Sequence, residues 1–390
     1  MLLEKSVKSV KSVVASSMII GIDASRAVTG QRTGTEAYAL HLIRALIPLA
    51  AERGHTLRLY FNEAPAADLF PDAPHVTPLV IPLRRMWTHA RLGHELRSRP
   101  PDVFFTPAHV IPVGIRCPSV ATVHDLGYEH FPEAHPRRQL AYLRWSTRHN
   151  ARVARRVIAD SRATADDLTA LYGTAPNKIA VVYPGADPGL RRVSDPATLA
   201  APAAKYAIPQ PYLLYLGTLQ PRKNLVRLVE AFATSDLHKD GYALVLAGRA
   251  GWLAEPLLVA VGALPPAVRE RVRLPGYVDE ADKAALLSGA TALVFPSLYE
   301  GFGFPILEAQ ACGVPVVCAG TSSLPEVAGD AALQVDPLDV AVMAAALRRV
   351  AGEGVLREGL IAKGYANLAR FRWEEAAAQT LAVLEAAGSG

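Results

Sequence analysis

Two glutamates stand eight residues apart in a glycine-rich part of the sequence. Glu300 and Glu308 enclose two glycines and Pro305, and an apolar run ends just before them at Phe295. Proline suits the start of a helix, so we predict that Glu308 lies in the first turn of a helix that opens after the glycines. A carboxylate accepts hydrogen bonds from a vicinal diol, and charged hydrogen bonds of this kind are worth about 1.5–3 kcal/mol. The pair therefore indicates a site for a sugar or a ribose. One alternative is that the two carboxylates are the catalytic pair of a glycosidase. The other is that Glu300 is a surface charge of a loop and Glu308 only interacts with the positive end of the helix.

Two adjacent cations, Arg222 and Lys223, open another predicted helix. They follow the apolar run Tyr212–Leu216 and a short loop that begins at Gly217. Cations at the start of a helix oppose its positive end, so the arrangement is more favourable when an anion such as a diphosphate binds there. A solvated pair of surface charges is the alternative explanation for these two residues taken alone.

Other loops and residue types argue against several kinds of site. The loop of residues 29–35 contains Gly30 and Gly34, but it has neither G-x-G-x-x-G spacing nor a Walker lysine, which disfavours a dinucleotide or P-loop site. The sequence has no D-x-D triplet, so a Mg²⁺ or Mn²⁺ clamp is not expected. The three cysteines show no C-x-x-C spacing, so neither a disulfide framework nor a structural zinc site is indicated. We expect no metal and no other cofactor.

Apolar, β-rich runs alternate with helical stretches from Met18 onward, which is the pattern of parallel βαβ units. The composition is 51% apolar and 20% charged, which excludes a disordered chain. The predicted strands are Met18–Ala24, His55–Phe61, Val103–Thr106, Val120–Val123, Val157–Ala159 and Ile179–Val182 in the first half, and Tyr212–Leu216, Ala243–Ala247, Ala292–Phe295 and Val314–Cys318 in the second. The fold class is therefore α/β.

The chain of 390 residues is longer than one ordinary domain of about 100–200 residues. We expect two Rossmann-like domains with doubly wound parallel sheets, covering residues 18–190 and 212–370 and facing each other across a cleft. Residues 1–17 are expected to form a flexible tail, and residues 191–211, where prolines accumulate, a linker. The last part, residues 371–390, is expected to form a helix that ends the second domain or packs back on the first.

The net charge of +5 is unevenly distributed. The first 200 residues carry 25 Lys and Arg against 17 Asp and Glu, and residues 134–159 contain seven arginines and no acid. A solvated helix face is the plain explanation, and attraction to anionic lipid or to a phosphorylated acceptor is the alternative. No motif supports a nucleic acid partner. No apolar run reaches the roughly 18 residues that span a bilayer, so we expect a cytoplasmic protein, with peripheral contact at the inner face of the cell membrane as a further hypothesis.

Three motifs together resemble one known family. They are the triplet Arg222-Lys223-Asn224 after a glycine-ended strand, the segment EGFGFPILEAQACGVPVV from Glu300 onward, and VYPGAD at residues 182–187. In combination they resemble the family 4 retaining glycosyltransferases of the GT-B fold, over most of the chain. The segments GTLQPRKN and VHDL look most like the bacterial mannosyltransferase-like members.

The resemblance implies a role for each matching residue. Arg222 and Lys223 would hold the donor diphosphate, Glu308 the nucleotide ribose, and Glu300 hydroxyls of the donor sugar. His124 would face the donor sugar from the N-terminal, acceptor-binding domain, with a general-base role as the alternative. Many relatives carry an arginine where this chain has Thr218, so Arg222 would compensate for the missing cation. The catalytic set is thus His124, Arg222, Lys223 and Glu300, and further donor-binding residues are Gly34, Gly217, Thr218, Gly301, Phe302, Gly303, Phe304 and Glu308.

The function implied is transfer of a hexose from a nucleotide diphosphate sugar to an acceptor hydroxyl with retention of configuration and without a metal. GDP-mannose is the preferred donor, and UDP-sugars would need few changes in the site. The acceptor would be a sugar or a lipid-linked sugar in cell-surface polysaccharide or glycolipid assembly. A nucleotide-sugar epimerase and a non-catalytic nucleotide-sugar binding protein are the alternatives.

Overall fold

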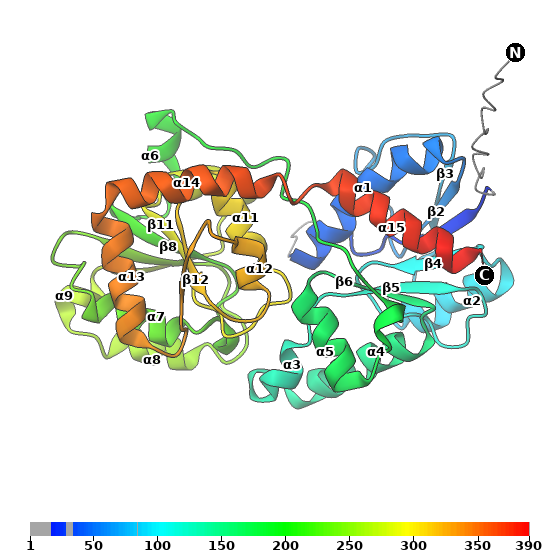
Figure 1. Cartoon of the computed structure of the whole chain (residues 1–390), viewed down its shortest axis with the longest axis horizontal. Coiled ribbons are helices and arrows are strands. Elements are labelled where there is room, and N and C mark those ends of the chain that lie inside the picture. Colours follow the sequence, from blue (N-terminus) through cyan, green and yellow to red (C-terminus); the bar gives the residue numbers. More distant parts are fainter. Residues whose placement is uncertain (1–16, 29–33, 84, 390) are drawn as a thin grey trace, which may run out of the picture.

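The computed structural model of the chain describes residues 17–28, 34–83 and 85–389. They form two parallel β-sheets, each covered by helices on both faces (Figure 1). The first sheet has the strand order β3-β2-β1-β4-β5-β6-β7 and the second β10-β9-β8-β11-β12-β13. The first sheet contains β1 (Ile19–Asp23), β2 (Thr56–Phe61), β3 (Val76–Val80), β4 (Val103–Thr106), β5 (Ser119–Val123), β6 (Arg156–Ala159) and β7 (Ile179–Val181). The second contains β8 (Tyr212–Leu216), β9 (Ala243–Ala247), β10 (Val272–Gly276), β11 (Ala292–Phe295), β12 (Val316–Ala319) and β13 (Leu333–Val335).

The helices of the first half are α1 (Gly34–Glu52), α2 (Gly93–Ser98), α3 (Gly127–His130), α4 (Arg137–Val153), α5 (Arg162–Tyr172) and α6 (Pro196–Lys205), with shorter turns η1 (Trp87–Leu92), η2 (Pro132–Ala134) and η3 (Pro176–Lys178). Those of the second half are η4 (Pro221–Lys223), α7 (Leu225–Thr234), α8 (Glu255–Gly262), α9 (Pro266–Arg269), α10 (Glu280–Ser288), α11 (Phe304–Ala311), α12 (Leu324–Ala328), α13 (Val340–Gly352), α14 (Gly354–Leu368) and α15 (Trp373–Gly388). Within the described residues, no helix is both long enough and apolar enough to cross a membrane.

The central strands are buried on both faces, which explains their nearly continuous apolar sequences. All residues of β4, β5, β9 and β11 are buried, for example, and each strand pairs in parallel with its neighbours. This arrangement confirms the predicted α/β class with two Rossmann-like sheets. The ten predicted strands all appear in the structure, with their ends shifted by at most two residues.

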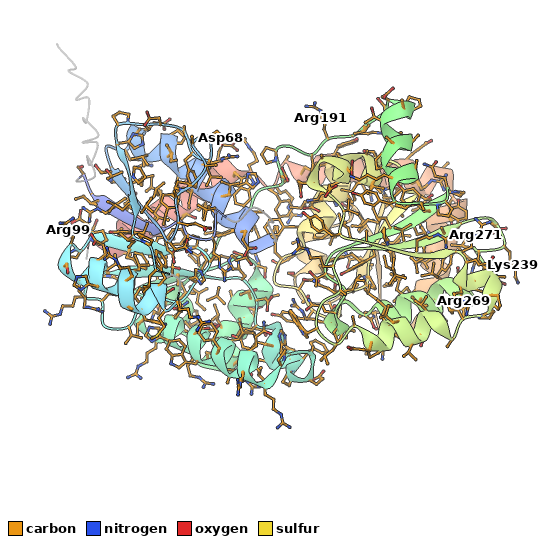
Figure 2. The ribbon with its side chains drawn as sticks, turned by 180° about the vertical axis from the view of Figure 1, so that it is seen from behind. Asp68, Arg99, Arg191, Lys239, Arg269 and Arg271 are labelled. Atoms are coloured by element: carbon orange, nitrogen blue, oxygen red, sulfur yellow. The ribbon has the colours of Figure 1, made fainter. Side chains whose placement is uncertain are left out.

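Three strands lack a clear signal in the sequence, and a helix lies where the sequence predicts a linker. β3, β10 and β13 lie at sheet edges, where a strand has one neighbour and its residues are only partly buried, so the apolar pattern is weak. The predicted linker of residues 191–211 contains α6, which Asp195 caps by accepting a hydrogen bond from the Thr198 backbone N–H. Arg191 lies on the segment before this helix (Figure 2). The predicted tail, apart from Ser17, and the first loop at residues 29–33 lie outside the described residues.

The last helix, α15, packs on the first sheet although the chain before it belongs to the second. Its apolar side contacts α1 and lies over β4, β5 and β6, and Trp373, Leu381 and Leu384 are part of the same core as Ile20 and Ile22. Figure 1 shows α14 on the second half leading into α15, which runs across the first half. The C-terminal segment therefore ties the two halves together.

Candidate active site

Each sheet has one point where the strand order reverses, between β1 and β4 in the first and between β8 and β11 in the second. Ligands of such sheets bind beyond the carboxyl ends of the strands at these points. In the second sheet, Arg222 and Lys223 follow β8 and Glu300 follows β11. The topology therefore brings together charged residues that stand 77 positions apart in sequence.

Lys223 and Glu300 form a nearly buried ion pair. Lys223 Nζ donates to Glu300 Oε1 at 2.5 Å, and the two side chains are 12% and 10% exposed. Burial lowers the pKa of Lys223, and the nearby Glu300 carboxylate only partly opposes this effect. The turn that carries the lysine is fixed by Asn224, whose φ is +60° and whose side-chain amide donates to the carbonyl oxygens of Pro296 and Pro337. The pair is thus held at the end of β8.

Arg222 points from the second half to the first. Its Nη1 lies 3.3 Å from Asp125 Oδ2, just beyond β5, and the arginine side chain is 11% exposed. Burial disfavours the charged guanidinium, but Asp125 and Glu300 outweigh this and raise the pKa of Arg222. Burial likewise opposes ionisation of Asp125, yet Arg222 and the Gly127 N–H hold the pKa of that carboxyl below its usual value. The buried Nε of Arg222 has no hydrogen-bond acceptor among the described residues.

His124 directly precedes Asp125, and each of its ring nitrogens lies within hydrogen-bond distance of an oxygen atom. Nδ1 lies 2.5 Å from Asp160 Oδ2, and Nε2 lies 2.9 Å from the carbonyl oxygen of Pro107. Burial alone would lower the pKa of His124, but Asp160 and the Pro107 carbonyl outweigh it and raise the pKa. A ring that carries protons on both nitrogens would donate to both of these oxygen atoms. In that form the imidazole has no lone pair with which to act as a base.

Gly301 brings the two halves into contact at this point. A Cβ atom at Gly301 would lie 1.8 Å from the carbonyl oxygen of His124 and 2.6 Å from Asp125 Cβ. The hydroxyl of Thr164 lies 3.2 Å from the His124 carbonyl oxygen and 3.4 Å from that of Gly301. The loop after β11 therefore meets the loop after β5 backbone to backbone, which only glycine permits at this position.

Glu308 lies one residue further into its helix than the sequence predicts, which places it beyond the first turn. α11 begins at Phe304, so Pro305 is the second residue of the helix and Glu308 the fifth, and the first turn contains no acid. The physical reason is Gly303, whose φ of +119° turns the chain into the helix one residue earlier than proline alone would indicate. The prediction that Glu308 lies in the first turn is therefore wrong.

Lys283 of α10 is the partner of Glu308, a contact that the sequence does not predict. Lys283 Nζ donates to Glu308 Oε1 at 2.6 Å, with both side chains 15% exposed, and to Glu280 Oε1 at 3.2 Å. Burial raises the pKa of Glu308, and Lys283 opposes this effect. No local pattern could have shown the pair, because α10 and α11 meet only through the packing of the second sheet.

The remaining predicted residues lie around these charges. Gly217 and Thr218 form the loop directly after β8, and Gly303 caps α11. Gly34 begins α1, where a Cβ atom would lie 3.1 Å from the ring of Phe304. The Phe302 side chain is buried between the rings of Phe304, Tyr183 and Phe371, so only its backbone is left to face a ligand. Within the described residues, no group of three or more His, Cys, Asp or Glu side chains is placed to hold a metal ion.

Known proteins resemble the chain in both halves. Residues 32–190 match the family model "Glycosyltransferase Family 4", and residues 203–367 match "Glycosyl transferases group 1". O-antigen chain mannosyltransferase B of Escherichia coli is 33% identical over 309 residues, which cover 78% of this chain and 79% of that protein.

Two solved structures share the fold. Sucrose-phosphate synthase of Thermosynechococcus elongatus has a TM-score of 0.71 at 20% identity, covering 94% of this chain and 98% of the other. HepE of Anabaena, in complex with UDP and glucose, has a TM-score of 0.71 at 18% identity, covering 94% and 99%. The fold with its two facing sheets is that of a GT-B glycosyltransferase. The chain belongs to the family 4 glycosyltransferases and resembles the bacterial mannosyltransferases among them.

Proposed function

We propose that this glycosyltransferase moves mannose from GDP-mannose to an acceptor hydroxyl, with retention of configuration and without a metal ion. The observation that carries the proposal is the set of charges at the end of β8. Arg222 and Lys223 stand together, both nearly buried, and the Arg222 Nε–H has no acceptor among the described residues. A buried donor without an acceptor is costly, so its presence favours an anionic ligand such as a diphosphate.

Each charged residue of the site would have its own role in the transfer reaction. The bond from the sugar C1 to the diphosphate oxygen breaks, a bond from C1 to the acceptor oxygen forms, and the acceptor proton passes to the departing diphosphate oxygen. Arg222 and Lys223 stabilise the negative charge that develops on the diphosphate. Glu300 and Glu308 accept hydrogen bonds from hydroxyls of the donor sugar and of the ribose. His124 contributes through its protonated ring or its carbonyl oxygen rather than as a base.

The choice of donor and pathway rests on the relatives. An Escherichia coli relative that is 33% identical is an O-antigen chain mannosyltransferase, which supports mannose and the assembly of a cell-surface polysaccharide or glycolipid. HepE, which shares the fold, binds UDP and glucose, so a UDP-sugar is the competing donor class. The acceptor is a sugar or a lipid-linked sugar, and contact with an anionic membrane is part of the proposal.

Thermal stability in the presence of nucleotide sugars tests the proposal. GDP-, UDP-, ADP- and dTDP-sugars are each added at about 100 times the dissociation constant, in a buffer that contains EDTA. At this concentration a bound ligand adds about 2.7 kcal/mol to the free energy of unfolding. We expect the GDP-sugar alone to raise the melting temperature, and Glu308→Ala and Lys223→Ala to lose the effect. Lys239→Ala, a substitution at an exposed lysine of the second half, is the control.

Product analysis then separates the alternatives. NMR of the product formed from GDP-mannose and an oligosaccharide acceptor gives the anomeric configuration, and retention is expected. Interconversion of the sugar without an acceptor would show an epimerase instead. Binding without transfer to any acceptor would show a binding protein, and a shift with UDP-sugars only would overturn the choice of GDP-mannose.

A further inference from the structure

The outer face of α4 carries aromatic and apolar side chains that face away from the sheet. Tyr142, Trp145 and Val153 are 50%, 43% and 45% exposed, and His149 stands between the last two. Their spacing of three, four and four residues places them along one side of the helix. The opposite side of α4 is buried and consists of Thr147, Asn150 and Ala151. Exposed tryptophan and tyrosine in one stripe are unusual for a surface that faces only water.

The aromatic rings of this stripe contact one another. The Trp145 ring stacks on His149 at 5.4 Å, lies 5.9 Å from the Tyr142 ring and meets His89 of η1 edge-on at 5.5 Å. The loop that follows β4 adds Val113, which is 50% exposed and whose backbone N–H donates to His89. The apolar surface thus extends from α4 to two neighbouring segments and is held rigid by ring contacts.

Arginines without acidic partners surround this surface. Among the described residues, Arg138, Arg152 and Arg155 are exposed and form no ion pair, and no acid occurs between residues 134 and 159. Arg144, in contrast, pairs with Glu129 at 2.8 Å on another side of the helix. The outer face therefore combines positive charge with aromatic rings.

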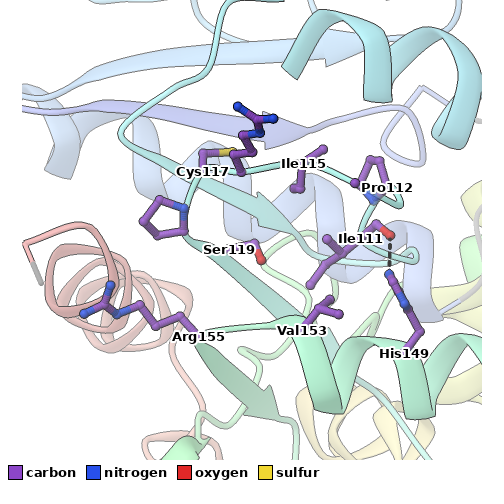
Figure 3. A pocket seen from close by; sticks show the side chains of 11 residues that line it. Ile111, Pro112, Ile115, Cys117, Ser119, His149, Val153 and Arg155 are labelled. Atoms are coloured by element: carbon purple, nitrogen blue, oxygen red, sulfur yellow. Dashed lines mark hydrogen bonds between the residues drawn. The ribbon is translucent and has the colours of Figure 1, made fainter. Parts of the chain in front are cut away.

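A hollow adjoins the carboxyl end of the stripe (Figure 3). It has a volume of about 310 Å³, and Ile111, Ile115 and Val153 form its apolar wall. Arg116 and Arg155 line it as well, and its lining includes no Asp or Glu. His149 Nε2 lies 3.0 Å from the Ile111 carbonyl oxygen, the contact that Figure 3 draws as a dashed line. Apolar walls with two arginines suit a phosphate group that is attached to a hydrocarbon chain.

We propose that the outer face of α4, with this hollow, binds the surface of a bilayer that contains anionic phospholipid. Tryptophan and tyrosine favour the boundary between lipid and water, and arginines near an anionic bilayer are attracted to it. An acidic protein would match the charge, but it would not by itself explain the exposed rings and the apolar hollow. The inference deepens the proposed function, because it names the surface by which the enzyme would reach a lipid-linked acceptor.

The position of α4 supports this link. Asn150 of α4 donates through Nδ2 to the His109 carbonyl oxygen at 3.0 Å, and its Oδ1 accepts from the Ile111 N–H at 2.9 Å. His109 follows β4, and Arg26, which follows β1, donates to His109 Nε2 at 2.8 Å. These residues stand at the point where the strand order of the first sheet reverses. A bilayer on α4 therefore lies next to the part of the first sheet where ligands bind.

Sedimentation of the full chain with vesicles tests the surface. Vesicles of phosphatidylcholine with 30% phosphatidylglycerol are compared with pure phosphatidylcholine at about 0.1 M salt. We expect binding to the anionic vesicles only, and about a fivefold loss of partition for each of Arg152→Gln and Arg155→Gln. The paired substitution Lys239→Gln with Arg269→Gln, on the second half of the molecule (Figure 2), is the matched control and leaves partition unchanged.

Tryptophan fluorescence gives a second readout. Trp145 is the most exposed of the four tryptophans, so anionic vesicles are expected to shift the emission to the blue, and Trp145→Phe abolishes the shift. Absence of vesicle binding, equal loss in the control, or binding to polyglutamate but not to vesicles would each overturn the proposal. Thermal stabilisation by GDP-mannose is measured on every variant, so failure of the membrane surface is distinguished from failure of the donor site.

Discussion

Replacing Lys283 with methionine tests how the buried pair with Glu308 works. Methionine keeps the length and the apolar stem of lysine but removes the charge that lies 2.6 Å from Glu308 Oε1. Both side chains are 15% exposed, and removing one partner of a buried pair costs about 3–5 kcal/mol because the other charge is left without a partner. The partial access to solvent puts the expectation at the lower limit, about 3 kcal/mol.

The substitution also changes the protonation of Glu308. Burial already raises the pKa of this carboxyl, and Lys283 is the group that opposes the rise. Without the lysine the pKa rises further, so a larger fraction of the carboxyl is protonated at a given pH. It then loses one acceptor for a ribose diol, and one charged hydrogen bond is worth about 1.5–3 kcal/mol. We expect GDP binding to weaken by roughly tenfold to a hundredfold at pH 7 and to recover as the pH rises.

Two assays check this expectation, with a matched lysine as the control. Lys205 of α6 forms bonds of 2.7 and 2.6 Å to Asp279 and Asp282 but is 50% exposed. Lys205→Met should therefore cost less than about 1 kcal/mol. Chemical unfolding gives the difference in stability between the two variants. Calorimetric titration with GDP and with 2′,3′-dideoxy-GDP gives the contribution of the ribose hydroxyls.

The reasoning would be refuted by either of two results. Equal losses of stability in the two variants would mean that burial does not strengthen the Lys283–Glu308 pair. An unchanged ratio of affinities for GDP and its dideoxy analogue would mean that Glu308 does not bind the ribose, even if the stability result holds. The first result concerns the structure alone, and the second concerns the proposed function.

Three further predictions concern the surroundings of His124 and the contacts between the halves. Gly301→Ala puts a methyl group against the His124 carbonyl oxygen, a clash that costs roughly 1–3 kcal/mol. The transfer rate should therefore fall about tenfold or more, while GDP still binds. An unchanged rate would contradict the close approach of the two loops. Asp160→Asn removes the carboxylate that raises the pKa of His124. The stability that the Asp160–His124 contact provides is fully present below about pH 6.5 and is lost as the pH rises through the raised pKa of His124. The melting temperatures of the variant and the wild type should therefore converge at alkaline pH. A constant difference between them would argue against this role of Asp160. Glu326 accepts hydrogen bonds from two N–H groups at the start of α5. Glu326→Gln should therefore lower the free energy of unfolding by about 1–2 kcal/mol and enlarge the radius of gyration in small-angle scattering. Identical scattering would show that this contact does not hold the halves together.

Short-range patterns predict the two loops of the site but not their partners. The glycines, proline and charges around Arg222, Lys223 and Glu300 are local features, and each loop follows an apolar strand that the sequence shows clearly. Asp160 and Lys283 lack such a signal, because each meets its partner only after distant segments have packed. The error at Glu308 has a local cause, since the left-handed Gly303 starts the helix before Pro305.

Two carboxylates that contact Arg222 and Lys223 explain how the protein tolerates two adjacent cations at the start of a helix. Arg222 and Lys223 repel each other and oppose the positive end of α7, and both are largely buried, so each would be costly alone. Asp125 from the first half and Glu300 from the loop after β11 each neutralise one of them. The site therefore carries no net charge from these four residues, and one of its two ion pairs joins the halves. An anion that binds here competes with Asp125 for Arg222, and we expect that competition to couple donor binding to the relative movement of the two halves.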